Sequence, residues 1–290
     1  SVFGQEGSGP HFAAKAKNVI FLNMVGGPSQ MDLFDYKPKM EEMAGKDLPD
    51  SIRRGQRLTT MTSLLSTHPI APTKYKFSRQ GQCGMWVSEM LPWLGKCADD
   101  LCWIRSMHTE AINHDPAVCC LQTGSEQPGK PSIGSWVSYG LGSLNANLPS
   151  FVVLVATPSN REQEQAISSR LWSPAFLPGE HGGVPFRGKG DPVLFLENPP
   201  GVPGPVRRAM LDGLKELNEL NFRKVGDPEI HARIEQYEMA FRMQTAVPEL
   251  AAIRDEPEST YALYGEEARQ PGTFAHTAVL ARRLVERGVR

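Results

Sequence analysis

A histidine between two polar residues forms the first candidate site in this sequence. Asn113, His114 and Asp115 stand directly before Pro116 and offer an amide, an imidazole and a carboxylate, which can bind a metal ion or transfer a proton. The apolar run 101–107 predicts a buried strand before them, and Pro116 suits the first turn of a helix after them. His114 is therefore predicted at the carboxyl end of a strand and the amino end of a helix. Open sheets bind ligands at such places, and free helix N–H groups favour an anion there.

A glycine turn near the amino end of the chain is the second candidate. Residues 18–25 form a nearly unbroken apolar run, which predicts a strand buried on both faces of a parallel sheet. Gly26 and Gly27 end that run and allow backbone angles that expose N–H groups to a ligand, while Ser29 and Asp32 add oxygen atoms. The alternative is an ordinary turn in which Ser29 or Asp32 caps a helix.

Composition and charge exclude several classes of protein. The 290 residues have 40% hydrophobic content, which is enough for a substantial core without metal or disulfide staples. A net charge of −1 and a pI of about 6.7 give no electrostatic footprint for nucleic acid or for an anionic membrane surface. No apolar run approaches the roughly 18 residues that spanning a bilayer requires. We therefore expect no nucleic-acid partner and no membrane span.

Predicted strands and helices alternate along the chain, which favours an α/β fold with a mostly parallel sheet flanked by helices. Three buried strands are predicted at 18–25, 101–107 and 151–156, and we expect them to be neighbours in one sheet. Residues 289–290 predict the beginning of another strand. The apolar spacing predicts helices at 85–97, 117–122 and 133–141, within 205–249, and at 274–285.

The predicted domain organisation has three parts. Residues 1–17 are Gly-rich and unpatterned and predict a flexible stub, such as the one that remains after a leader is removed. Residues 18–290 are predicted to form the amino-terminal portion of a single domain. Within it, residues 157–204 are rich in Pro and Gly and predict a long excursion over the rim of the sheet, of the kind that shapes many sites.

Three stretches carry a family resemblance, and they are Asn18–Pro38, Ile104–Pro116 and Leu280–Arg290. They are similar to a large bacterial family of sulfatase-like proteins of unknown function, related to the alkaline phosphatase superfamily. The resemblance covers essentially the whole chain. It implies an alkaline phosphatase or sulfatase-like α/β sheet that is incomplete at the carboxyl end, because members of the family continue into further Asp- and His-bearing motifs. It also implies export by a twin-arginine signal, to the periplasm.

Comparison with sulfatases bears on individual residues. Their nucleophile motif has Cys or Ser two residues before a Pro, and a Thr-Gly pair at the end of the same helix. Pro116 and Thr123-Gly124 match that motif and place His114 at the nucleophile position. Sulfatases end their first strand with paired metal-binding Asp residues, whereas Asp32 is the nearest carboxylate here. An imidazole can bind a metal, act as a general base or accept a phosphoryl group. The resemblance therefore implies that His114 still takes part in the chemistry, although by a mechanism other than that of ordinary sulfatases.

These residues predict a metal-dependent hydrolase of sulfate or phosphate esters, with a small-molecule or glycan ester as substrate. The expected cofactor is a divalent metal ion (zinc, calcium or manganese), which would polarise the ester oxygen and lower the pKa of a bound water. The alternative is a non-catalytic protein that binds sulfated or phosphorylated glycans on the same fold.

Asp32 and His114 are expected to meet in one crevice. The histidines with no sequence neighbours that suggest a site are His68, His181, His231 and His276. The assigned residues are His114 as the catalytic group, Asp32, His114 and Asn113 as metal ligands, and Gly26, Gly27 and Ser29 as anion-binding residues.

Overall fold

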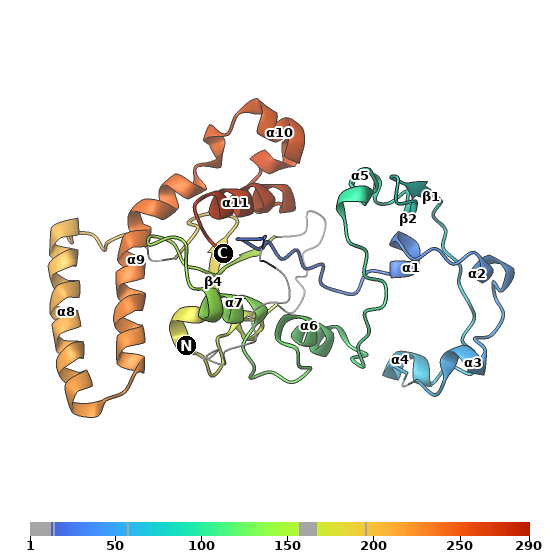
Figure 1. Ribbon diagram of the computed structural model, residues 1–290, viewed down its shortest axis with the longest axis horizontal. Coiled ribbons are helices and arrows are strands. Elements are labelled where there is room, and N and C mark those ends of the chain that lie inside the picture. Colours follow the sequence, from blue (N-terminus) through green and yellow to red (C-terminus); the bar gives the residue numbers. More distant parts are fainter. Residues whose placement is uncertain (1–12, 14, 57, 157–166, 195) are drawn as a thin grey trace. The chain divides into compact units, whose positions relative to one another are not determined.

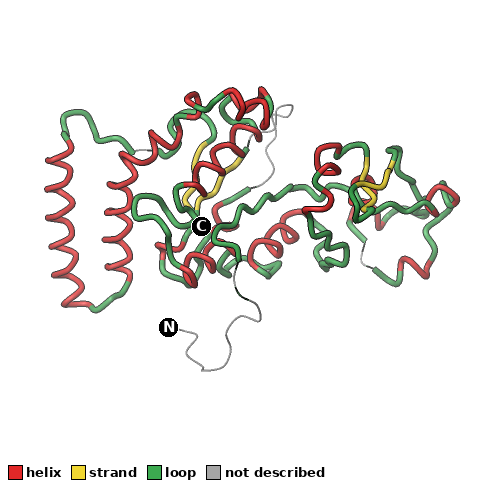
Figure 2. The backbone as a smooth tube through the Cα atoms, turned by 45° about the horizontal axis from the view of Figure 1, so that its top comes forward, coloured by secondary structure: helices red, strands yellow, loops and turns green. Residues whose placement is uncertain are grey.

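The computed structural model describes residue 13 and residues 15–56, 58–156, 167–194 and 196–290. The chain divides into two compact units, a smaller one formed by residues 23–121 and a larger one formed by residues 1–22 and 122–290. Figure 1 labels their elements, and Figure 2 marks helices, strands and loops. Most of the predicted stub at 1–17 falls outside the described residues, as do residues 157–166 of the predicted rim excursion.

Short elements make up the smaller unit. They are α1 Gln30–Leu33, α2 Lys39–Glu42, α3 Asp50–Arg53, α4 Thr60–Ser63, β1 Phe77–Gln80, β2 Met85–Ser88, α5 Pro92–Lys96, the 3-10 helix η1 Ala98–Asp100, and α6 His114–Thr123, whose last turn extends past residue 121. β1 and β2 form an antiparallel hairpin in which Phe77 is paired with Ser88. The Tyr36 ring packs on this hairpin, with ring centroids 5.0 Å from Phe77 and 4.8 Å from Trp86. These aromatic contacts anchor the segment that follows α1.

Longer helices make up most of the larger unit. Its elements are α7 Ile133–Leu141, β3 Val152–Val155, η2 Ser169–Trp172, η3 Gly179–His181, β4 Val184–Arg187, α8 Gly204–Val225, α9 Glu229–Ala251, η4 Ile253–Asp255, α10 Glu258–Tyr264, η5 Glu266–Arg269 and α11 Phe274–Glu286. α8 and α9 form a helical hairpin (Figures 1 and 2). α8 ends where Gly226 takes a left-handed φ of 73°, and Pro228 precedes α9. None of the described helices is long and apolar enough to cross a membrane.

The core of the larger unit lies between α9, α11 and the β3–β4 pair. Leu250 of α9 and Val279 and Leu280 of α11 are at most 2% exposed, and Phe186 of β4 is equally buried. Leu284 follows Leu280 by one helical turn and is also buried, so the two side chains share one face of α11. Burial of these apolar side chains supplies most of the free energy that holds the layers together.

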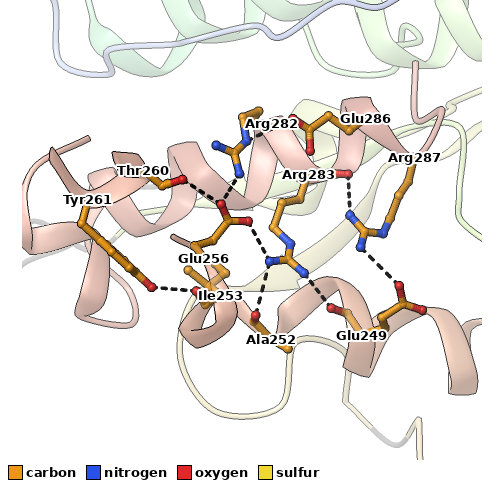
Figure 3. Close-up of polar contacts among 10 residues, drawn as sticks. All are labelled: Glu249, Ala252, Ile253, Glu256, Thr260, Tyr261, Arg282, Arg283, Glu286 and Arg287. Carbon is orange, nitrogen blue, oxygen red and sulfur yellow. Dashed lines mark hydrogen bonds and ion pairs between the residues drawn. The ribbon is translucent and has the colours of Figure 1, made fainter. Parts of the chain in front are cut away.

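A buried polar network joins α11 to the carboxyl end of α9, as Figure 3 shows. Arg283 donates hydrogen bonds to the Glu256 carboxylate at 2.8 Å and to the Glu249 carbonyl oxygen at 2.9 Å. Arg282 and the Thr260 hydroxyl bind the other Glu256 oxygen. Burial raises the pKa of Glu256, but the hydrogen bonds from the two arginines and the threonine outweigh it and hold this pKa below its usual value. The Arg283 cation also suits the carboxyl end of α9, where the carbonyl groups carry partial negative charge.

The predicted fold class is wrong. Helices dominate the described residues, and the sheets among them are two pairs of strands, β1–β2 and β3–β4. β3 and β4 are parallel, with Val152 opposite Val184, but no further described strand extends the pair. A mostly parallel, sulfatase-like sheet flanked by helices is therefore absent from the described part of the chain.

Two of the three predicted strands do not form. Residues 18–25 and 101–107 are irregular, and many of their apolar side chains are exposed, Leu22 to 69% and Met107 to 75%. Only the run 151–156 contains a strand, β3. An apolar run becomes a strand where a neighbour supplies a ladder of hydrogen bonds, and no described residues supply one to the other two runs.

The helix predictions were more accurate. α7 has the predicted bounds, α11 covers the helix predicted at 274–285, and the helix predicted at 117–122 lies inside α6. The helical pattern within 205–249 is divided between α8 and α9. The predicted helix at 85–97 is wrong in its first half, where β2 pairs with β1. Pro92 explains the boundary, because the residue before a proline is disfavoured in helical geometry, and Leu91 has φ −121° and ψ 55°.

Residues 289 and 290 lie between two segments that are distant in sequence. The Arg290 N–H donates to the Ser150 carbonyl oxygen at 3.2 Å, and the Arg290 carbonyl oxygen accepts from the Val19 N–H at 2.7 Å. The Asn18 amide donates to the Val289 carbonyl oxygen at 2.7 Å. These bonds hold residues 18–19 and 150 on either side of Arg290, although residues 289–290 are not part of a strand.

Candidate functional site

His114 is the first residue of α6. The Asn113 carbonyl oxygen accepts the Ala117 N–H at 3.2 Å, which closes the first turn of the helix. Pro116 fits this turn because the N–H that it lacks would have no partner within the helix. Asn113, His114 and Asp115 are all exposed. The His114 imidazole is therefore accessible at the amino end of a helix, where backbone N–H groups carry partial positive charge.

The turn formed by Gly26 and Gly27 lies against the His114 ring. The φ angles of the two glycines are 102° and 61°, values that favour glycine. A Cβ atom placed on Gly27 would lie 3.8 Å from His114 Nδ1, so the glycine backbone approaches the imidazole closely. Neither glycine N–H forms a hydrogen bond of good geometry with a described residue, although the turn at Val25 and Gly26 brings the Gly27 N–H toward the Met24 carbonyl oxygen. The structure thus brings together two motifs that are far apart in sequence, an imidazole and a turn with two N–H donors.

Asp32 is held by other partners. Side-chain hydrogen bonds from Thr73 and Ser29 hold the pKa of the Asp32 carboxyl below its usual value. Ser29 is also the N-cap residue of α1, although its side chain accepts no bond from a helix N–H. Among the described residues, no hydrogen bond or ion pair joins Asp32 to His114. The carboxylate and Ser29 therefore serve the local geometry of α1 and its contact with Thr73.

Thr73→Val is expected to raise the pKa of Asp32 toward its usual value of 3.8, because a hydrogen bond to the carboxylate stabilises the charged form. The pKa is measured from the carboxyl carbon chemical shift of Asp32 during a pH titration. Thr109→Val is the control, since the Thr109 hydroxyl accepts the Ala111 N–H instead. An Asp32 pKa that is the same in the wild type and in Thr73→Val would show that this hydrogen bond does not set it.

The predicted ligand set does not fit a metal ion in this arrangement. Across the described parts of the chain, no three His, Cys, Asp or Glu residues are grouped so as to hold one. The Asp32 carboxylate is bound by two hydroxyl groups, and His114 lies against a glycine turn that offers N–H donors but no second ligand. Protein sites for zinc supply at least three ligands. The predicted set contains two side chains of the types that bind zinc, Asp32 and His114, while its third member, Asn113, is an amide.

A polar cluster around His181, in the larger unit, was not predicted from the sequence. The Ser138 hydroxyl lies 2.9 Å from His181 Nδ1 and 2.6 Å from the Ser150 hydroxyl, and Glu180 lies 3.4 Å from His181 Nε2. Ser138 and His181 are 43 residues apart, so no local motif joins them. The one signal in the sequence was a Glu-His pair inside a glycine-rich stretch. This cluster borders a cavity.

The described residues thus form a mostly helical fold with two small sheets, and their candidate site is a histidine beside a glycine turn. The chain belongs to the family described as protein of unknown function, DUF1501, which it matches over residues 16–290. No curated protein and no solved structure matches it.

Proposed function

We propose that this protein hydrolyses sulfate or phosphate esters, with His114 as the general base. A water molecule attacks the sulfur or phosphorus atom, its proton passes to the imidazole, and the ester oxygen leaves as an alcohol after it regains the proton. The observation that carries the proposal is the position of the His114 ring against Gly27, beside N–H groups that form no hydrogen bond of good geometry with a described residue. A base and anion-binding donors are the two components that this reaction needs.

The anionic oxygens of the ester group are proposed to accept hydrogen bonds from the Gly26 and Gly27 N–H groups. The amino end of α6 adds further donors, because its first N–H groups have no partner within the helix. The match of Pro116 and Thr123-Gly124 to the sulfatase nucleophile motif also supports a chemical role for His114. From the same resemblance we propose export to the periplasm.

The proposed reaction assigns no step to a metal ion, because the predicted set of Asp32, Asn113 and His114 holds two zinc-binding side chains rather than three. Dependence on zinc, calcium or manganese is therefore an experimental question that the activity assay answers directly. Activity that survives a chelator would support His114 as the base acting by itself. Activity that requires an added ion would mean that the residues rearrange when the ion binds.

His114→Ala is expected to lower kcat/KM for p-nitrophenyl sulfate or p-nitrophenyl phosphate by at least about tenfold, because a positioned general base contributes this much or more. The release of p-nitrophenolate is measured with each divalent ion and with a chelator. His108→Ala is the matched control, since His108 is an exposed histidine of the same unit whose nearest charged partner is Glu110, at 3.9 Å. Equal loss of activity in both variants, or none in His114→Ala, would contradict the proposal.

The second candidate is a non-catalytic protein that binds sulfated or phosphorylated glycans. It is favoured by His114 in place of the sulfatase nucleophile and by the lack of paired Asp residues after the run 18–25. The same donors would then hold the anion without turnover. Saturable binding of a sulfated oligosaccharide that weakens in His114→Ala, in a protein that hydrolyses neither ester, would support this alternative over the hydrolase.

A further inference from the structure

A cavity of about 520 Å³ lies within the larger unit. Its volume falls in the range of small-molecule pockets, roughly 300–1,000 Å³. Its walls come from α7, from η3 and the two glycines after it, and from the middle of α9, and Figure 1 labels α7 and α9. His114 belongs to the smaller unit and does not line this cavity, so the cavity is independent of the proposed ester hydrolysis.

Part of the cavity lining is apolar. Val184 of β4, Val193, Leu196 and Met239 of α9 all contribute to it. Transfer of apolar surface from water to such a wall is favourable, so the cavity favours a ligand with an apolar body. Met239 adapts its shape easily, because its side chain is unbranched and has several rotatable bonds.

Two arginines of the lining lack partners. Arg207 of α8 and Arg242 of α9 both line the cavity, and neither side chain forms a hydrogen bond or an ion pair with any described residue. Arg242 Nε is buried without an acceptor. The neighbouring Arg208 differs, since Glu238 and Asp212 bind its guanidinium. A buried cationic donor without an acceptor is unfavourable, so an incoming anion would be stabilised at this wall.

The carboxylates of the lining leave these two guanidinium groups free. Glu180 lies 3.4 Å from His181 Nε2, and Glu235 is exposed to solvent. The hydroxyls and the imidazole of the lining satisfy one another when Ser150 donates to Ser138 and Ser138 donates to His181 Nδ1. His181 Nε2 then carries the proton that faces Glu180. This polar cluster needs no ligand, whereas Arg242 Nε is buried without an acceptor, and the charge nearest to it, that of Glu238, is already bound by Arg208.

We propose that this cavity binds a small amphiphilic anion. Its head group, a carboxylate or a phosphate, pairs with Arg207 and Arg242, and its apolar body lies against Val184, Val193 and Met239. Both head groups share the chemistry that a guanidinium recognises, a planar or tetrahedral set of oxygens that accepts two hydrogen bonds. A neutral polar ligand would fit this cavity less well, because it would neither pair with the guanidinium groups nor bury apolar surface against the wall.

The test is calorimetric titration of the full chain with octanoate, octyl phosphate and 1-octanol. We expect saturable binding of at least one anion, with 1-octanol at least about tenfold weaker, because a charge-assisted hydrogen bond is worth at least that much. The stronger of the two anions identifies the head group. No binding of either anion, or equal binding of 1-octanol, would overturn the proposal.

The matched variants are Arg242→Gln and Arg233→Gln. Both residues belong to α9, but Arg233 is exposed and does not line the cavity. Arg242→Gln is expected to weaken anion binding by about tenfold or more, and Arg233→Gln to leave it unchanged. Arg207→Gln on α8 gives the same readout if Arg242→Gln fails to fold. Wild-type affinity in a folded Arg242→Gln or Arg207→Gln protein would contradict the assignment of the head-group site.

Discussion

Arg283→Met is expected to lower the free energy of unfolding of the larger unit by roughly 3–5 kcal/mol, the cost of removing one partner from a buried ion pair. The side chains of Arg283 and Glu256 are only 10% and 9% exposed. The variant leaves Glu256 with one guanidinium partner instead of two, and it leaves the Glu249 carbonyl oxygen at the end of α9 with the Ala252 N–H as its donor (Figure 3). Methionine keeps much of the length of the side chain, so the loss reports on the polar contacts.

Arg287→Met is the control for this prediction. Arg287 also approaches Glu249, but its 3.4 Å ion pair is with a carboxylate that is 75% exposed, and such pairs contribute less than about 1 kcal/mol. Urea denaturation followed by circular dichroism gives both free energies. A loss below about 1 kcal/mol in Arg283→Met would show that hydration replaces the network at little cost.

Gly134→Ala and Gly140→Ala are expected to change stability in opposite directions, although both residues belong to α7. Alanine normally stabilises a helix by about 1 kcal/mol relative to glycine, and nothing lies within 4 Å of a Cβ atom at Gly140. At Gly134 the Cβ atom would overlap the Phe151 ring. The resulting overpacking is expected to cost roughly 1–3 kcal/mol.

The Phe151 ring has little room to move away from an alanine at 134. Its opposite edge faces Gly183, where an added Cβ atom would lie 2.8 Å from Phe151 Cε1, and the Phe151 carbonyl oxygen accepts the Val184 N–H at 3.1 Å. Thermal unfolding of the two variants, side by side, measures the difference. A Gly134→Ala protein as stable as Gly140→Ala would mean that the ring rotates into space that the packing does not reveal.

The elements that the sequence predicted well are those whose signals are local. The run 133–141 carries its helical period within itself, and Ser132 caps it by accepting the Ser135 N–H, so α7 was predicted to the residue. A strand instead depends on a neighbour that no local pattern reveals. The apolar runs 18–25 and 101–107 therefore suggested strands that the structure lacks, while 184–187, inside a Pro- and Gly-rich stretch, became β4.

The candidate site was predicted in part for the same reason. Backbone freedom at Gly27 and the helix start at His114 are local properties, and the two residues do meet. The bond between Asp32 and Thr73 links residues that no motif joins, so the sequence could not indicate it. The hydrogen-bond partner of a polar side chain depends on the tertiary structure, so residue spacing in the sequence does not predict it.

The position of Arg290 has a consequence for how the chain folds. The hydrogen bonds that link residues 18 and 19 to residues 289 and 290 span 271 positions in sequence. The chain therefore loses conformational entropy on closing this loop before the stabilising contacts form. During synthesis, residues 18 and 19 leave the ribosome long before residues 289 and 290. Until then the apolar side chains of Val19 to Leu22 can contact other chains. We therefore expect this junction to be among the last parts of the larger unit to form, and the region where incompletely folded molecules are most prone to associate.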